Sequence, residues 1–137
     1  MSSATTKYGR DDDDWDQLAD AGHAFLIERA RLRKTTSYTE LNTVIANRTG
    51  LPGFDFGQDS ERAAMGHLLW LIVERDVHKT NLMLSALVQY LDANDAGTGF
   101  YKYAMELGLL PRGAGSQQKE AFWIHQLSAI HDYYARI

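Results

Sequence analysis

The sequence predicts a mainly α-helical fold with room for a small sheet. Three observations predict it. Apolar residues recur at helical spacing from Trp15 to Leu32, a capping sequence opens a helix at Ser37, and the last twenty residues carry a wide apolar face. We count about five helices and find neither an internal repeat nor an interdomain linker. Residues 15–137 therefore form a single helical domain, and a winged-helix-like core is one arrangement of it.

The first helix is expected over 15–34, on the apolar set Trp15, Leu18, Gly22, Phe25 and Leu32. An aspartate run lies beside its first turn and basic residues beside its last, as the helix dipole favours. The segment before it, residues 1–14, is polar and aperiodic and is predicted to be a flexible acidic arm.

The second helix has clear end signals. The sequence Ser37-Tyr38-Thr39-Glu40 matches a capping box, and Gly50 is a natural stop. Residues 51–58 then form a loop whose two phenylalanines, Phe54 and Phe56, fold back onto the core.

A third helix, capped by Asp59 or Ser60, runs to about Asp76. Its middle, 65–73, is apolar almost all round, which predicts the central buried helix.

The stretch 82–90 fits a buried strand or a helix, and we favour the strand because a turn rich in Asn, Asp and Gly follows. A helix of about ten residues opens at Thr98 or Gly99 and stops at Gly108 and Pro111. The last helix is expected over about 117–136.

The composition is that of a soluble globular protein, with 45% apolar and 23% charged residues in 137. No stretch is long enough to span a membrane and the first residues lack the apolar core of a secretion signal, so we expect a cytoplasmic protein without membrane contact. The net charge of −4 lies within residues 1–20, and the rest of the chain is neutral. The domain therefore lacks the broad positive field of a nonspecific nucleic-acid binder.

The sequence predicts no metal and no cofactor. There is no cysteine, and the five histidines lack the spacing of three or four that places two ligands on one helix face. The nucleophile turn G-x-S-x-G of serine hydrolases is absent. The glycines at 97 and 99 lack the remaining residues of a dinucleotide or phosphate-binding loop.

An anion or nucleic-acid contact is one site hypothesis. Arg29 and Arg33 lie four apart on one helix face, Arg48 follows nearby, and Arg62 begins the third helix. The amides of Thr98 and Gly99 at a helix start are a second place for an anion. The alternative for the arginines is pairing with Glu28 and Glu40 on a solvated surface.

A pocket is the second site hypothesis. It places Tyr38, Glu40, His67 and Asp95 near the loop that ends at Phe100. A histidine with a neighbouring carboxylate is the group to seek there.

A protein interface on the C-terminal helix is the third site hypothesis. Phe122, Trp123, Tyr133 and Tyr134 exceed what one core stripe needs, and surplus aromatic side chains often mark interfaces.

Several segments resemble a pattern of small, poorly characterised bacterial and phage-borne domains. These carry a helix of the type YTYGELA and later a segment like LLSALVV…TGxPGxGFF…A…LG. The matching residues here are Ser37 to Leu41, Leu84 to Val88, Gly97 to Phe100 and Ala104 to Gly108. The first piece also resembles the winged-helix domain of O6-alkylguanine-DNA alkyltransferases, but the Pro-Cys-His-Arg motif of that family is missing, so alkyl transfer is excluded.

Three functions follow as expectations. The first is a non-enzymatic binding or regulatory module of a bacterial or phage system that acts through protein contacts or self-association. The second is a sequence-specific nucleic-acid-binding protein of winged-helix type. The third is a small enzyme with a pocket near the loop 97–100.

Overall fold

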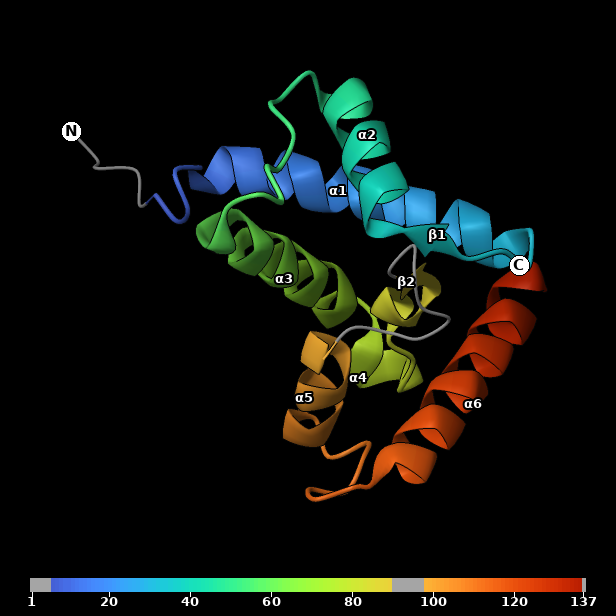
Figure 1. The fold of residues 1–137 in the computed structure, drawn as a ribbon. Helices are drawn as coiled ribbons and strands as arrows, with labels where there is room; N and C mark the ends of the chain where they lie inside the picture. The colour runs from blue at the N-terminus through green and yellow to red at the C-terminus, as the bar shows by residue number, and fades with distance from the viewer. Residues whose placement is uncertain (1–5, 90–97, 137) are drawn as a thin grey trace.

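A computed structural model describes residues 6–89 and 98–136, and these are mainly helical, as the sequence predicts (Figure 1). The α-helices are α1 (Asp12–Arg31), α2 (Tyr38–Thr49), α3 (Asp59–Glu74), α4 (Val77–Thr80), α5 (Thr98–Glu106) and α6 (Ser116–Ala135). A 3-10 helix, η1 (Leu84–Leu87), precedes the short strand β2 (Val88–Gln89), which pairs in parallel with β1 (Thr36–Ser37). In the described ranges, no helix has both the length and the apolar character that a membrane span requires.

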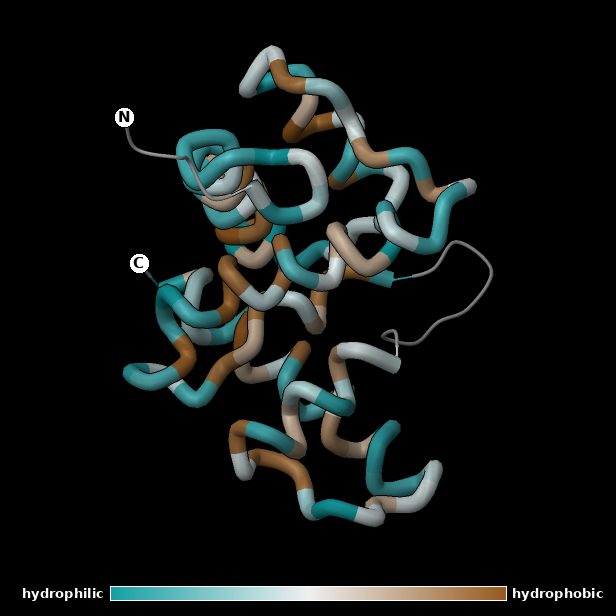
Figure 2. The backbone as a smooth tube through the Cα atoms, turned by 90° about the vertical axis from the view of Figure 1, so that its left-hand side faces the viewer, coloured by the Kyte–Doolittle hydropathy of each residue, from teal (hydrophilic) through white to brown (hydrophobic). Residues whose placement is uncertain are grey.

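Helix α1 packs against α2, α3, α6 and η1 and so lies at the centre of the contacts that form the core. Apolar and polar segments alternate along the helices, as expected of helices with one face in a shared core (Figure 2). Gly22 of α1 permits its close approach to α3, since a Cβ added there would lie 2.6 Å from Cδ1 of Ile72. The close packing of α1 against α3 therefore depends on glycine at position 22.

The N-terminal segment joins the domain earlier than the sequence suggested. Helix α1 begins at Asp12, and its N-cap Asp11 accepts a hydrogen bond from the backbone N–H of Asp14 at 2.8 Å. Lys7 and Arg10 form a two-residue antiparallel bridge, and the Trp15 indole N–H donates to the Lys7 carbonyl at 3.0 Å. Residues 7–14 are therefore held by the domain, whereas we expected the arm to extend to residue 14.

The expected ends of the second helix are confirmed. The Ser37 hydroxyl accepts from the Glu40 backbone N–H at 3.0 Å, and Gly50 has the left-handed φ of 73° that glycine tolerates. The Glu40 carboxylate accepts instead from Thr36 Oγ1 at 2.5 Å and from Arg29 at 2.7 Å. Glu40 thereby ties α2 to α1 rather than completing a capping box.

The loop 51–58 returns to the core as predicted, with Phe54 buried and Phe56 partly buried against the core. Asn42 of α2 holds it by two hydrogen bonds with the backbone of Phe54. The N-cap of α3 is Gln58, one residue before the expected cap, and its side chain makes no capping hydrogen bond.

Helix α3 is not buried all round, contrary to our prediction. One face enters the core through Met65, Leu68 and Ile72, while Trp70 on another face is 42% exposed. Apolar content alone was not a sufficient guide, because a tryptophan at the surface is as apolar in the sequence as one in a core.

The predicted strand over 82–90 is also wrong in most of its length. The structure describes this segment as far as residue 89: it turns through η1, and within 82–89 only Val88 and Gln89 pair with another strand. Side chains of α6 form hydrogen bonds with the backbone of the residues before β2. Gln126 accepts from the Met83 N–H at 2.7 Å, and Trp123 donates to the Ala86 carbonyl at 2.9 Å. With these partners the buried segment needs no neighbouring strand.

Candidate ligand pocket between helices α3 and α5

A pocket of about 690 Å³ lies between α3 and α5, with walls from three further segments. Its lining residues are Lys7, Tyr8, Tyr38, Ala63, Gly66, His67, Leu69, Trp70, Ser85, Gly99, Phe100, Lys102, Tyr103 and Glu106. The volume is in the range of natural small-molecule sites.

Two helix faces with the same spacing form the long walls. Helix α3 contributes Ala63, Gly66, His67 and Trp70, and α5 contributes Gly99, Lys102, Tyr103 and Glu106. Each set follows the spacing i, i+3, i+4, i+7 of one helix face. The small residues open the space, since a Cβ added at Gly66 or at Gly99 would meet no atom within 4 Å.

Aromatic rings form a continuous series along one side of the pocket. The His67 ring lies edge-on to Trp15, with centroids 4.7 Å apart, and stacks with Trp70 at 5.7 Å and 19°. Tyr8 is 6.1 Å from His67, and Tyr103 is 6.5 Å from Trp70. Tyr8 and Trp70 remain 40% and 42% exposed, so the rings of these two residues are accessible to solvent.

His67 is held as a neutral imidazole. Burial lowers its pKa from the usual 6.5, and the charge of Lys7 lowers it further. In the described part of the chain its ring nitrogens have no hydrogen-bond partner. A neutral imidazole has one donor and one acceptor, and both remain available to a molecule in the pocket.

Tyr103 fixes α5 against α3. Its hydroxyl donates a hydrogen bond to Oε2 of Glu74, one turn beyond Trp70 on α3. Burial raises the pKa of Tyr103 and the neighbouring carboxylate raises it further, while the same hydrogen bond lowers the pKa of Glu74. The tyrosine is therefore a neutral donor to a charged acceptor, which is a strong form of hydrogen bond.

The ionic groups of the pocket are two lysines and one carboxylate. Lys7 and Lys102 are exposed at the rim, and among the residues that the structure describes neither has an ion-pair partner. Glu106 lies four residues after Lys102 on α5. With His67 neutral, the lining carries one net positive charge.

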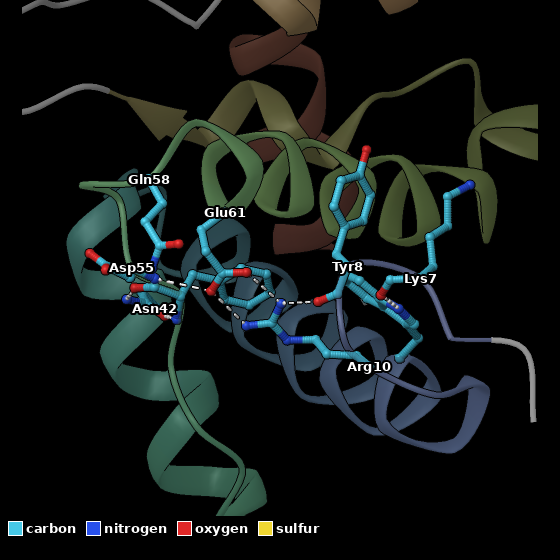
Figure 3. Close-up of polar contacts among 9 residues, drawn as sticks. Lys7, Tyr8, Arg10, Asn42, Asp55, Gln58 and Glu61 are labelled. Atoms are coloured by element: carbon cyan, nitrogen blue, oxygen red, sulfur yellow. Dashed lines mark hydrogen bonds and ion pairs between the residues drawn. The ribbon is translucent and has the colours of Figure 1, made fainter.

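A clamp at the start of α3 holds Lys7 and Tyr8 at the rim (Figure 3). Arg10 donates to both oxygens of Glu61, at 2.9 and 3.0 Å, and to the Tyr8 carbonyl at 3.2 Å. Its guanidinium lies 4.0 Å from the centroid of the Phe54 ring. Glu61 also accepts from the backbone N–H of Asp55 at 3.2 Å. The N-terminal segment, the loop 51–58 and α3 are thus joined beside the pocket.

The structure brings together part of the predicted pocket set. Tyr38, His67 and Phe100 line one cavity although they come from three separate helices, and Gly99, which was predicted as an anion contact, lines it too. Thr98, the other predicted anion contact of that helix start, is the exposed first residue of α5 and is not part of the lining. Glu40 does not belong to the lining, because it bonds to Arg29 and Thr36. Asp95 lies outside the described residues.

Each arginine that was predicted to contact an anion forms an ion pair with a carboxylate of the protein. Arg29 pairs with Glu40 at 2.7 Å, and Arg48 donates to both oxygens of Glu28 at 2.8 Å. Arg33 pairs with Asp132 at 3.0 Å, and Arg62 pairs closely with Asp59. For Arg29 and Arg48 this is the alternative weighed from the sequence, in which Glu40 and Glu28 pair with them, whereas Arg62 pairs within its own helix.

Two of the four predicted interface residues belong to the core. Trp123 is 6% exposed and donates to the backbone of η1, and Tyr134 is 4% exposed and donates to Asp76 at 3.4 Å. Phe122 is partly buried, 5.7 Å from the Phe100 ring, whereas Tyr133 remains 43% exposed. The surplus of aromatic residues is explained largely by packing against η1 and α5.

Sequence reasoning missed most of the lining, including Gly66, Trp70, Ser85 and the α5 residues Lys102 and Tyr103. A signal was present: small or polar residues recur at helical spacing, as Ala63, Gly66 and His67 on α3 and as Gly99, Lys102 and Glu106 on α5. That spacing marks a face that is not packed as core, but it does not reveal that the two faces meet.

Comparison of the chain with protein-family models, with curated proteins and with solved structures found no match. The case for a function therefore rests on the geometry of the pocket.

Proposed function

We propose that this protein is a non-enzymatic binding module and that the pocket between α3 and α5 is its recognition site for a small molecule. One observation carries the proposal: a 690 Å³ cavity whose lining combines aromatic rings with a few polar and charged groups. That composition is typical of ligand sites, in which apolar surface provides affinity and a few polar groups fix the orientation.

The surroundings of His67 favour binding over catalysis. A catalytic histidine is usually oriented by a carboxylate or carbonyl that accepts from its second nitrogen. The described neighbours of this ring are Trp15, Tyr8 and Trp70, which contact its faces and edges. Glu40, the carboxylate expected nearby, bonds elsewhere.

Neither of the other expected surfaces offers comparable support. Nucleic-acid contact through Arg29, Arg33 or Arg48 would require each guanidinium to leave a carboxylate partner. A protein interface on the C-terminal helix would lack Trp123 and Tyr134, because both side chains are buried in the core.

The test is binding of small fused-ring probes, measured by calorimetry with indole, 2-naphthamide and 2-naphthoate. The wild-type protein should bind at least one of them, and Gly66→Leu should lower that affinity about tenfold or more, because the new side chain enters the pocket. Gly66→Leu should still fold, since its Cβ meets nothing within 4 Å and leucine is the better helix former.

Ser128→Leu is the matched control, because it places the same side chain on an exposed position of α6. It should leave the affinity unchanged. The proposal is wrong if no probe binds at millimolar concentration, or if Gly66→Leu and Ser128→Leu have the same effect.

A further inference from the structure

We propose that the pocket takes a flat aromatic molecule that carries a single negative charge, such as an aryl carboxylate. The inference rests on the proposed function and adds to it the chemical class of the ligand. The rings, the unpaired lysines and the unused polar groups of the lining each support one part of it.

The aromatic lining favours a flat ring system. Six of the lining residues are aromatic, counting the His67 imidazole: Tyr8, Tyr38, His67, Trp70, Phe100 and Tyr103. They come from the N-terminal segment and from α2, α3 and α5, so they surround the cavity on several sides. A planar ring among them gains edge-to-face and offset-stacked contacts beyond its burial, which an aliphatic ligand of equal size does not.

The lysines favour an anion. Lys7 lines the cavity from the N-terminal segment and Lys102 from α5, and across the described ranges no carboxylate forms an ion pair with either one. The arginines discussed above, by contrast, are occupied by carboxylates. Gly99 lies in the first turn of α5 and brings the positive end of that helix to the same cavity.

Glu106 limits the charge of the ligand to one. Because this carboxylate shares the lining with Lys7 and Lys102, the cavity presents one net positive charge. A monoanion balances that charge, whereas a polyphosphate would leave uncompensated negative charge beside Glu106. The site therefore fits a carboxylate or sulfonate better than a nucleoside di- or triphosphate.

Two polar groups remain to orient the molecule. Ser85 is 5% exposed, lines the cavity, and in the described part of the chain makes no side-chain hydrogen bond. The ring nitrogens of His67 are likewise unused. A hydroxyl and a neutral imidazole together supply donors and acceptors for a polar substituent on the ring system.

The test compares 2-naphthoate with 2-naphthamide, which share shape and differ in charge. Wild-type protein should bind the naphthoate about fivefold more tightly, the size expected of contacts with exposed charges. Lys102→Met and Lys7→Met should each reduce that preference, because they weaken naphthoate binding more than naphthamide binding. Lys79→Met, which removes an exposed lysine on α4, should change neither.

The outcomes separate the two proposals. Equal affinity for the two naphthalene probes, with both lost in Gly66→Leu, would retain the binding site and overturn its preference for an anion. Displacement of naphthoate by equimolar acetate would overturn the need for a ring. Binding of indole alone would likewise retain the site and overturn its preference for an anion. Failure of indole, 2-naphthamide and 2-naphthoate alike to bind, or binding that is insensitive to Gly66→Leu, would overturn the proposed function itself.

Discussion

Arg10 joins the N-terminal segment to the loop 51–58 and to the start of α3, which lie more than forty residues further along the chain. Its guanidinium bonds to Glu61 on α3, to the Tyr8 carbonyl, and lies over the Phe54 ring. The side chains of Arg10 and Glu61 are only 12% and 17% exposed, so the pair is shielded from solvent on most sides. The pair therefore differs from the surface pairs of the same protein, whose contribution to stability is small.

Replacement of Arg10 by methionine should destabilise the fold and loosen the pocket rim. Loss of a charged hydrogen-bonding partner leaves Glu61 shielded and unpaired, and the expected decrease in the free energy of unfolding is about 2 kcal/mol. Arg48→Met is the control, because the bidentate Arg48–Glu28 pair is 40% and 52% exposed. There we expect a decrease of about 0.5 kcal/mol. Urea denaturation measures both, and equal losses would contradict the account of the clamp.

His67 should make the stability of the protein depend on pH. Its pKa is lowered in the folded state, chiefly by burial, whereas the unfolded residue has the usual value of 6.5. Between those two values the unfolded chain binds more protons, so stability falls as the pH drops through 6.5. His67→Gln removes this contribution.

Unfolding free energies of both proteins at pH 5 to 8 provide the measurement. The wild-type value should decline toward pH 5 more steeply than the His67→Gln value. A difference between the two proteins that stays constant over this range would show that His67 is not shielded as described.

At the scale of elements, the contact between α1 and α3 depends on Gly22. A methyl group at this position would lie 2.6 Å from Cδ1 of Ile72 and 3.8 Å from Cγ2 of Ile45. Gly22→Ala gains about 1 kcal/mol of helix propensity, but overpacking in a core costs about 1 to 3 kcal/mol, so the variant should be less stable by about 1 kcal/mol.

Ile72→Val tests whether Ile72 causes the loss of stability in Gly22→Ala, because valine lacks the Cδ1 atom that the new methyl group would meet. Alone it should cost about 1 kcal/mol. Combined with Gly22→Ala it should cost less than the sum of the two single changes, by about 1 kcal/mol. Thermal or chemical denaturation of the four proteins tests this, and additive losses would mean that Ile72 does not limit the approach.

The elements also show which parts of the fold the sequence predicts. The ends of α2 follow from local chemistry, since Ser37 and Gly50 act on backbone groups within four residues. The segment 82–90 does not, because the partners of its backbone, Gln126 and Trp123, lie on α6 about forty residues away. A local pattern cannot specify hydrogen bonds made with distant side chains.

At the scale of the whole molecule, the pocket is assembled from five segments. The N-terminal segment, α2, α3, η1 and α5 each contribute, and only the fold brings their faces together. His67 was predictable as the polar residue within an apolar helix, and Phe100 as the residue after a glycine turn. Lys7 was not, because its position depends on the clamp between Arg10 and Glu61.

The most direct test of the recognition site is the position of a bound probe. Intermolecular nuclear Overhauser effects between 2-naphthoate and the isotopically labelled protein give that position. We predict contacts from the naphthalene ring to the Gly66 backbone and to the rings of Trp70 and Tyr103, which line the two helix faces of the pocket. Contacts confined to a second, smaller cavity of about 300 Å³, which Leu51 and Pro52 line, or to exposed residues of α6, would contradict the account.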